Sequence, residues 1–353
     1  MIARREVVVV GGGQAGLAIG RLLADQGRDF TVLEAASTPA AAWRERWDSL
    51  VLFTPVRYDS LPGKPFPGDP DHYPTRDEVV AYLEEYARDL PVELNSPVTG
   101  VRRAGDGYVV ALDDRSYEAD QVVIATGPFQ VPVIPAIASA LDPAVVQLHS
   151  TEYRNPDVLP PGRVLVVGGG NTGFQIAEEL AGSRDVHLAI GSRQTPLPQR
   201  ILGRDLFRYL EALGLMRKSV ETRLGSRLQD RETLIGSTPR GLRRRGVRLH
   251  PRAVAASGAE VTFSDGVRLS VDAVLWATGY RVDHSWIDVP IFEESGRARH
   301  RRGVTSAPGL YFLGLQWQYT RGSALLGWVE EDARHIAERI AAHQRTKSPR
   351  VAA

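Results

Sequence analysis

Cysteine is absent from all 353 residues of this chain. Without thiols the protein forms no disulfide, holds no thiolate-bound metal and carries no redox-active cysteine pair. Electron transfer through a disulfide of the protein is therefore excluded. The absence also fits a reducing compartment, because disulfides persist mainly in oxidising ones. We expect a cytoplasmic protein.

Long apolar runs and an excess of one charge are missing as well. No stretch approaches the roughly 20 apolar residues that span a bilayer, and the opening MIARRE leads directly into an expected core strand rather than a signal peptide. Lys+Arg 43 and Asp+Glu 42 leave a net charge of +1, too weak a field to favour nucleic acid or an anionic membrane. We expect neither partner, and we interpret the Arg-rich run at 240–245 as a solvated basic face.

Glycine, in contrast, is abundant, with 34 residues. The spacing GxGxxG occurs twice, in EVVVVGGGQAG (Gly11, Gly13, Gly16) and in RVLVVGGGNTG (Gly168, Gly170, Gly173). In a dinucleotide-binding turn the first glycine permits the tight bend, the second lets the backbone approach a pyrophosphate, and the third lets the helix pack on the strand. One match is compatible with a tight loop that binds nothing. Two matches, each between an apolar strand and a helical segment, predict two nucleotide sites, most simply for a flavin and a nicotinamide.

The residues that follow each turn distinguish the two sites. Glu34 ends the strand about 20 residues beyond the first turn, where a carboxylate can accept hydrogen bonds from ribose hydroxyls. We assign FAD to this turn, with Gln14 and Ala15 at the start of its helix.

The corresponding strand after the second turn ends in Ser192 and Arg193. A hydroxyl and a guanidinium tolerate the 2′-phosphate that a carboxylate would repel, which predicts NADPH rather than NADH at this site. Asn171 and Thr172 begin its helix. The alternative is that Arg193 is a solvated loop residue.

The order strand, turn, helix, strand appears first from Glu6 and restarts near Arg163, as an internal repeat. We predict an α/β fold with two Rossmann-like dinucleotide-binding domains, the NADPH domain inserted into the FAD domain. The expected FAD domain comprises 1–157 and 282–353, and the NADPH domain 158–281 contains a helical Arg-rich insert at 196–245. A capping box at Thr75 opens one helix, and an amphipathic pattern predicts a last helix from Ser323 to about His343.

Further segments resemble those of two-dinucleotide-binding-domain flavoproteins and, within them, class B flavin monooxygenases, over nearly the whole chain. Trp43 to Asp48 (WRERWD) resembles the WRxRWD/YD segment after the FAD ribose site, and ATG at 125–127 and ATGY at 277–280 resemble the two linkers between the domains. HSTEYR at 149–154 resembles the HxxxYR half of the monooxygenase fingerprint. Its FxG half is replaced, with Pro143 and Val145 where Phe and Gly are expected.

The resemblance implies further cofactor contacts, which are Trp43, Arg44, Trp47, Thr126, Gly127, Gly314 and Ser323 for FAD, and Thr278 and Gly279 on the NADPH side. It also places the loop after Gly314 against the flavin. Disulfide-reductase relatives carry Gly-Asp where this chain has Gly314-Leu315, a difference that favours the monooxygenase branch. His149 is the candidate catalytic residue, and the alternative is that it organises the linker. No metal cluster stands out.

Three functions remain open. The first is an NADPH- and FAD-dependent monooxygenase, in which hydride from NADPH reduces FAD, O₂ is activated as a flavin hydroperoxide, and a small organic substrate is oxygenated. The second is a ferredoxin–NADP reductase-like electron-transfer flavoprotein, with the basic run at 240–245 facing an acidic partner. The third is a non-catalytic sensor of FAD or NADPH. The WRERWD, HSTEYR and ATGY segments favour the first, while substrate, type of oxygenation and oligomeric state stay open.

Overall fold

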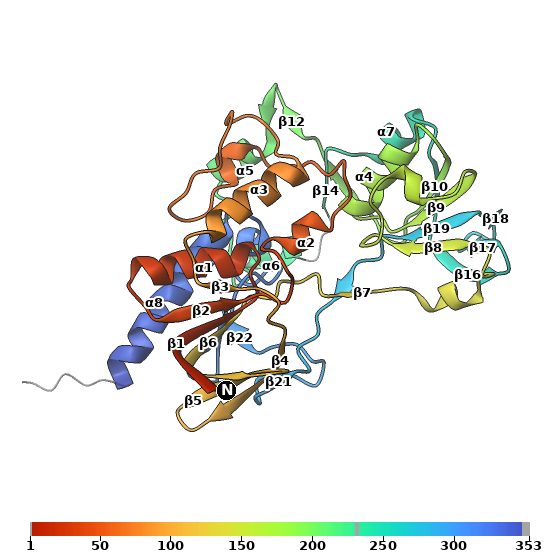
Figure 1. The fold of residues 1–353 in the computed structure, drawn as a ribbon. Coiled ribbons are helices and arrows are strands. Elements are labelled where there is room, and N and C mark those ends of the chain that lie inside the picture. The colour runs from red at the N-terminus through yellow and green to blue at the C-terminus, as the bar shows by residue number, and fades with distance from the viewer. Residues whose placement is uncertain (1, 230–232, 348–353) are drawn as a thin grey trace, which may run out of the picture.

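The larger of two main sheets contains ten strands. The computed structural model describes residues 2–229 and 233–347, and Figure 1 shows the two sheets side by side, with β7 passing between them. The main path of the first sheet runs β21-β4-β5-β6-β1-β2-β3. Its strands are β1 (Ile2–Val10), β2 (Phe30–Leu33), β3 (Val92–Glu93), β4 (Val98–Ala104), β5 (Gly107–Leu112), β6 (Ser116–Ile124), β21 (Ile287–Asp288), β22 (His300–Arg301), β23 (Val304–Thr305) and β24 (Leu310–Phe312).

The second sheet has five parallel strands in the order β15-β10-β9-β19-β8. These are β8 (Val146–His149), β9 (Arg163–Val167), β10 (Asp185–Ala189), β15 (Arg248–His250) and β19 (Ala273–Trp276). They lie in the chain between β6 and β21, so the second sheet is inserted into the first. The predicted fold class is thereby confirmed.

Helices and short strands complete the two units. The helices are α1 (Gln14–Asp25), α2 (Ala41–Arg44), α3 (Arg76–Ala87), α4 (Asn171–Leu180), α5 (Leu206–Ala212), α6 (Arg223–Gln229), α7 (Pro239–Arg244) and α8 (Val329–Lys347), with 3₁₀ turns η1 (Val56–Tyr58), η2 (Ala136–Ala140), η3 (Pro156–Val158) and η4 (Arg321–Ala324). The short strands are β7 (Val131–Pro132), β11 (Thr195–Leu197), β12 (Arg200–Ile201), β13 (Arg204–Asp205), β14 (Thr233–Ile235), β16 (Ala253–Ser257), β17 (Glu260–Phe263), β18 (Arg268–Ser270) and β20 (Tyr280–Arg281). Helices α1, α3 and α8 share one hydrophobic cluster on a face of the first sheet.

The strands before the two glycine turns are buried on both faces. Residues 7–10 of β1 lie between parallel strands β2 and β6, and residues 164–167 of β9 lie between β10 and β19. Central parallel strands favour such continuous apolar runs, because both of their faces are covered. Each strand ends at its glycine turn, so both turns stand at the carboxyl edge of a sheet, where open α/β folds bind ligands.

The starts of two helices can be compared with their predictions from the sequence. The capping box at Thr75 and Glu78 is present at the start of α3, as predicted. The last helix was predicted to begin at Ser323, and this is wrong: η4 ends at Ala324 and α8 begins at Val329. Between them Gly327 lies against the backbone of Tyr58, where a Cβ would come within 1.2 Å of the carbonyl oxygen. This contact with a distant segment delays the helix.

Two expectations about the second unit also need correction. The region 196–245 was predicted to be helical, but it contains β11 to β14 as well as α5, α6 and α7. The strand β8 precedes the predicted boundary at residue 157 and yet pairs with β19, with His149 opposite Trp276. Short strands that pair with distant partners leave no periodic signal of their own. The domain boundaries themselves stay a prediction.

Candidate functional site: a cavity that joins the two glycine turns

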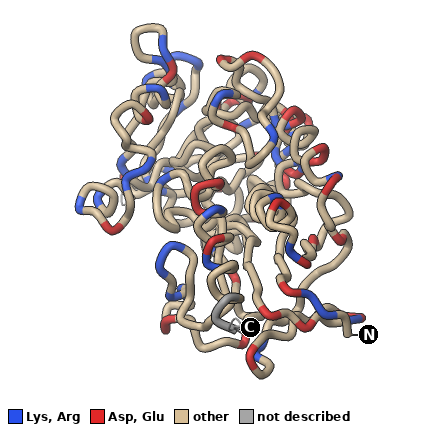
Figure 2. Tube along the Cα trace, turned by 90° about the vertical axis from the view of Figure 1, so that its left-hand side faces the viewer, with Lys and Arg blue, Asp and Glu red and all other residues tan. Residues whose placement is uncertain are grey.

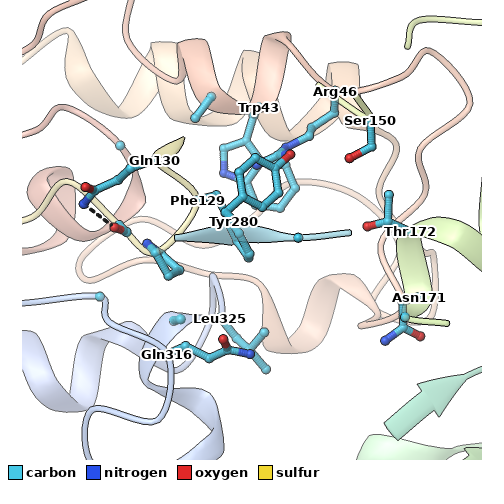
Figure 3. Close-up of a pocket in the computed structure, with 18 of the residues that line it drawn as sticks. Trp43, Arg46, Phe129, Gln130, Ser150, Asn171, Thr172, Tyr280, Gln316 and Leu325 are labelled. Carbon is cyan, nitrogen blue, oxygen red and sulfur yellow. Dashed lines mark hydrogen bonds between the residues drawn. The ribbon is translucent and has the colours of Figure 1, made fainter. Parts of the chain in front are cut away.

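A cavity of about 1370 Å³ is lined by residues of both glycine turns. Figure 3 shows part of its lining, with Asn171 and Thr172 on one side and Gln316 and Leu325 on another. The predicted site residues that line it are Gly11, Gly13, Gln14, Ala15, Glu34, Trp43, Trp47, Thr126, Gly127, Gly168, Gly170, Asn171, Thr172, Ser192, Thr278, Gly279 and Gly314. Residues far apart in the sequence are thus gathered around one space, which is large enough for more than one small ligand.

The first turn is tight where the chain bends and open where a ligand would approach. Gly11 has a φ of +109°, and a Cβ at Gly16 would lie 1.8 Å from the Gly11 carbonyl oxygen. Gly13 is the N-cap of α1, no side chain among the described residues caps it, and a Cβ there would meet no described atom within 4 Å. The first N–H groups of α1 therefore face open space with the positive end of the helix dipole.

Glu34 is held against this turn by two backbone amides. Its Oε2 accepts a hydrogen bond from Gly12 N at 2.6 Å, and its Oε1 accepts one from Ala36 N at 2.9 Å. The carboxylate is thereby fixed in place at the cavity wall. It retains lone pairs that can accept hydrogen bonds from ribose hydroxyls.

The second turn repeats this construction. Gly168 has a φ of +138°, and a Cβ at Gly173 would lie 2.2 Å from the Gly168 carbonyl oxygen. Gly170 is the N-cap of α4, again without a side-chain cap among the described residues. The Asn171 side chain accepts from Ile235 N and donates to the Thr233 carbonyl, both at 2.9 Å, so that β14 is fixed beside the turn.

Six predicted site residues lie outside the described lining of the cavity, namely Gly16, Arg44, His149, Gly173, Arg193 and Ser323. Gly16 and Gly173 pack inside their turns. Arg44 forms an ion pair with Glu84, and Arg193 is exposed. The Ser323 hydroxyl accepts hydrogen bonds from Tyr319 N and Thr320 N and closes η4, which is a structural role.

His149 lies behind the cavity wall. Its Nε2 is 3.1 Å from the Gly279 carbonyl, its Nδ1 is 3.0 Å from the Thr151 hydroxyl, and its ring packs edge-on against Tyr280, which does line the cavity. Burial lowers the pKa of His149 below its usual value and so favours the neutral ring. This placement suits a residue that positions Tyr280.

The WRERWD and HSTEYR segments dock on each other. Arg154 donates to the Glu45 carbonyl, Asp48 N donates to the Arg154 carbonyl at 2.7 Å, and the Asn155 amide donates to the Asp48 carboxylate at 2.7 Å. The bonds from Asn155 and Arg76 keep the pKa of Asp48 below its usual range. Two motifs that lie about 100 residues apart therefore form one joint beside the cavity.

The charged residues of the cavity were mostly missed by the sequence reasoning. Within the part of the chain that the structure describes, the lining holds one acid, Glu34, and three arginines, Arg46, Arg252 and Arg321. Arg46 belongs to the WRERWD segment but was not predicted as a site residue. Arg252 and Arg321 belong to none of the predicted motifs. Only their spatial convergence reveals them.

The three guanidiniums have no carboxylate within 4.0 Å among the described residues. Arg46 donates to the Tyr280 hydroxyl at 2.8 Å and lies over the Phe129 ring, as Figure 3 shows. Burial lowers the pKa of Arg321, whose guanidinium donates to the Thr233 hydroxyl at 3.4 Å. A pocket with three unpaired cations and two uncapped helix N-termini fits anionic dinucleotides.

These features define a flavoprotein of the two-dinucleotide type, and the chain belongs to the pyridine nucleotide-disulphide oxidoreductase family, whose sequence profile matches residues 8–200. Within it, the protein is a FAD-dependent oxidoreductase of the flavin monooxygenase type that uses a pyridine nucleotide. Because the chain has no cysteine, it lacks the disulphide of the family name.

Particular relatives are similar over almost the full length. The chain is 41% identical to an uncharacterized CzcO-like oxidoreductase of Geobacillus kaustophilus, over 96% of this chain and 99% of the relative. It is 30% identical to the indole-3-pyruvate monooxygenase YUCCA4 of Oryza sativa, over 94% and 86%. Among solved structures, a flavin-containing monooxygenase from Stenotrophomonas maltophilia matches with a TM-score of 0.82 and 29% identity, over 97% of this chain and 99% of that one.

Within residues 2–229 and 233–347, no group of acidic or histidine side chains could hold a metal ion. No helix in the same ranges is long and apolar enough to cross a membrane.

Proposed function

We propose that the protein is an NADPH-dependent flavin monooxygenase that oxygenates a small organic molecule in the cytoplasm. One observation carries the proposal: both glycine turns open into a single cavity, so a nicotinamide and a flavin bound at them can meet. Because no cysteine is present to receive electrons, they must leave the flavin for oxygen or for an external acceptor.

We assign FAD to the first turn and NADPH to the second. The N–H groups at the start of α1 would hold the FAD pyrophosphate, Glu34 its adenosine ribose, and the linker at Thr126 and Gly127 would border it. The start of α4, with Asn171 and Thr172, would hold the pyrophosphate of NADPH. Trp43 would help to hold the first site in place, because its indole N–H donates to the Gln14 side chain, at the start of α1, at 3.0 Å.

The cofactors supply hydride transfer and oxygen activation, by way of a flavin hydroperoxide, when they are bound. The chain's own residues position them and control their surroundings. Arg46 and Arg321 place positive charge in the cavity, and no carboxylate among the described residues lies within 4.0 Å of either guanidinium. Apolar side chains such as Leu52, Phe53 and Trp317 line the same space and limit the access of water.

The oxygen reaction tests this proposal. FAD-loaded protein is reduced anaerobically with NADPH and mixed with oxygenated buffer in a stopped-flow spectrometer. We expect a transient absorbance of oxygenated flavin before the oxidised spectrum returns. Immediate reoxidation with one peroxide released per flavin would contradict the proposal.

The electron-transfer alternative has less support. Arg245 of the basic run pairs with Glu178, and Figure 2 shows Lys and Arg interspersed with Asp and Glu along the chain. A docking face for an acidic protein needs a coherent patch of positive charge. Reduction of a ferredoxin with a steep dependence on salt would revive this alternative.

A further inference from the structure

The two glycine turns can be compared position by position. In the first, the middle glycine, Gly12, lies against Glu34: a Cβ there would be 2.8 Å from the Glu34 Cβ and 2.9 Å from Oε2. In the second, the middle glycine, Gly169, lies against Gln194, and a Cβ there would be 2.2 Å from Nε2. Gln194 therefore occupies at the second turn the place that Glu34 occupies at the first.

The Gln194 side chain is aimed at the second turn and is only partly satisfied. Its Nε2 donates to the Ser192 carbonyl at 3.1 Å, whereas its buried Oε1 has no hydrogen-bond partner among the described residues. An amide carries no charge, so a phosphate is not repelled at the position where a carboxylate would repel it.

A cation lies beside this amide. Strands β10 and β15 are parallel neighbours, so their carboxyl ends meet at one edge of the sheet and bring Arg252 next to Gly191. The Arg252 Nη2 donates to the Gly191 carbonyl at 2.7 Å, and its Cζ lies 3.2 Å from the position of a Cβ on Gly191.

Arg252 also fits the requirements of a phosphate ligand. It lines the cavity, and no carboxylate among the described residues lies within 4.0 Å of its guanidinium. The described lining contains neither Arg193 nor Gln194. The Gln194 side chain lies against Gly169 of the turn, whereas Arg193 has no described contact with the turn.

We propose that Arg252 selects the phosphorylated pyridine nucleotide by binding its 2′-phosphate, that Gln194 permits this phosphate, and that Arg193 contributes little. The inference rests on the proposed use of NADPH at the second turn. A guanidinium presents a planar set of N–H donors that matches phosphate oxygens, which makes it better suited than a point charge. The positive charge that binds the phosphate would thus come from Arg252, just after β15, rather than from Arg193 in the loop that follows β10.

Binding of 2′,5′-ADP and 5′-AMP to the FAD-loaded protein tests the assignment by calorimetry, without turnover. We expect Arg252→Ala to weaken 2′,5′-ADP binding at least about tenfold, as the loss of a charged hydrogen bond implies, and to leave 5′-AMP unchanged. Arg193→Ala, the matched control, should stay within about threefold of the unsubstituted protein for both ligands. Equal effects on both ligands, or the larger loss in Arg193→Ala, would overturn the proposal.

Anaerobic reduction of the flavin by NADPH and NADH provides the second arm. Gln194→Glu places at the second turn a carboxylate like that of Glu34 at the first. We expect it to lower the second-order rate constant of flavin reduction by NADPH at least about tenfold and to leave the rate constant with NADH unchanged. A loss shared by both nucleotides would count against the assignment. If Arg252→Ala loses flavin, Arg252→Lys keeps the charge and should retain part of the preference.

The two hypotheses fail separately. If neither nucleotide bleaches the flavin of the unsubstituted protein, the proposed function is wrong. If NADPH bleaches the flavin of the unsubstituted protein and that of Arg252→Ala equally well, only the role of Arg252 is wrong.

Discussion

At the residue scale, the side chains that lie against the two glycine turns differ in one functional group. A carboxylate, Glu34, lies against the first turn and an amide, Gln194, lies against the second. The backbone around them is nearly the same, since both turns require glycine for the same contacts. Under the proposed assignment of FAD and NADPH, this difference in side-chain charge on a shared scaffold helps to separate two cofactors that are themselves alike.

Replacing Glu34 with Gln should weaken FAD binding. Glutamine offers one neutral acceptor oxygen where the carboxylate uses two, for Gly12 N and Ala36 N, so one backbone amide loses its acceptor and the other loses a charged one. We expect the dissociation constant of FAD to rise about tenfold, as measured by flavin fluorescence on reconstitution. Glu45→Gln, at an exposed side chain outside the lining, is the control. Equal affinities in the two variants would refute the role of Glu34.

Asp59 should make stability depend on pH. Its side chain is buried, at 1% exposure, accepts one hydrogen bond from the Thr54 hydroxyl at 2.6 Å, and leaves Oδ2 without a partner among the described residues. Burial raises the pKa of Asp59 to about 7. Because the folded state then holds its proton more tightly than the unfolded state, Asp59 costs stability as pH rises from about 4 to 7.

Asp59→Asn removes this cost. We expect its melting temperature to gain on that of the unsubstituted protein between pH 5 and pH 8, by the equivalent of about 2–4 kcal/mol. Asp113→Asn, at an exposed side chain, should show no such gain. A constant difference between Asp59→Asn and the unsubstituted protein across this pH range would contradict the prediction.

At the scale of elements, the strand–turn–helix units are fixed by local contacts. Gly16 is the tightest of these, since its Cβ position falls on the Gly11 carbonyl. The joint between the WRERWD and HSTEYR segments is built from backbone carbonyls and short polar side chains. The strand–turn–helix units follow from local sequence, whereas the joint between the WRERWD and HSTEYR segments forms only when the two sheets come together.

Gly16→Ala should therefore damage the first unit. An added methyl group would collide with the backbone carbonyl of Gly11 in the turn, so we expect a loss of about 3 kcal/mol or more, seen as a lower melting temperature and reduced flavin content. Gly182→Ala places a methyl group where no described atom lies within 4 Å. It should be neutral or stabilise by up to about 1 kcal/mol. Similar effects in both variants would show that the close approach at Gly16 is unimportant.

Features that depend on local contacts could be predicted from the sequence, and features that depend on distant segments could not. The two glycine turns, Glu34 and the capping box at Thr75 were predictable, because spacing over a few residues determines them. The membership of β8 in the second sheet, the start of α8 and the positions of Arg252 and Arg321 were not, because each depends on a partner distant in the chain. Arg193 was predicted to line the site because it follows Ser192 in the sequence, but it is absent from the described cavity lining.

At the scale of the whole molecule, the cavity combines residues from three separate stretches of chain. Arg46 comes from the first unit, Arg252 from the inserted one and Arg321 from the returning segment. Their charges face one acid among the described lining residues. The small net charge of the whole chain therefore conceals an excess of positive charge along the cavity, which suits ligands that carry several phosphates.

Binding of NADPH should weaken as salt increases. Mobile ions screen the attraction between the arginines and the phosphates, so we expect the dissociation constant to rise several-fold between 50 and 300 mM NaCl. Arg321→Gln should weaken binding and flatten this dependence. Arg243→Gln, on the exposed surface of α7, should leave it unchanged. A slope that is the same in Arg321→Gln and in the unsubstituted protein would contradict this electrostatic account.

If the two glycine turns bring a pyridine nucleotide and a flavin into one cavity, NADPH must be able to reduce the flavin. An anaerobic titration of the FAD-loaded protein with NADPH, followed by the flavin absorbance near 450 nm, tests it most directly. We expect complete bleaching at about one equivalent of NADPH per flavin, since a hydride carries the two electrons that the flavin accepts. A flavin that stays oxidised in the presence of excess NADPH would contradict the account.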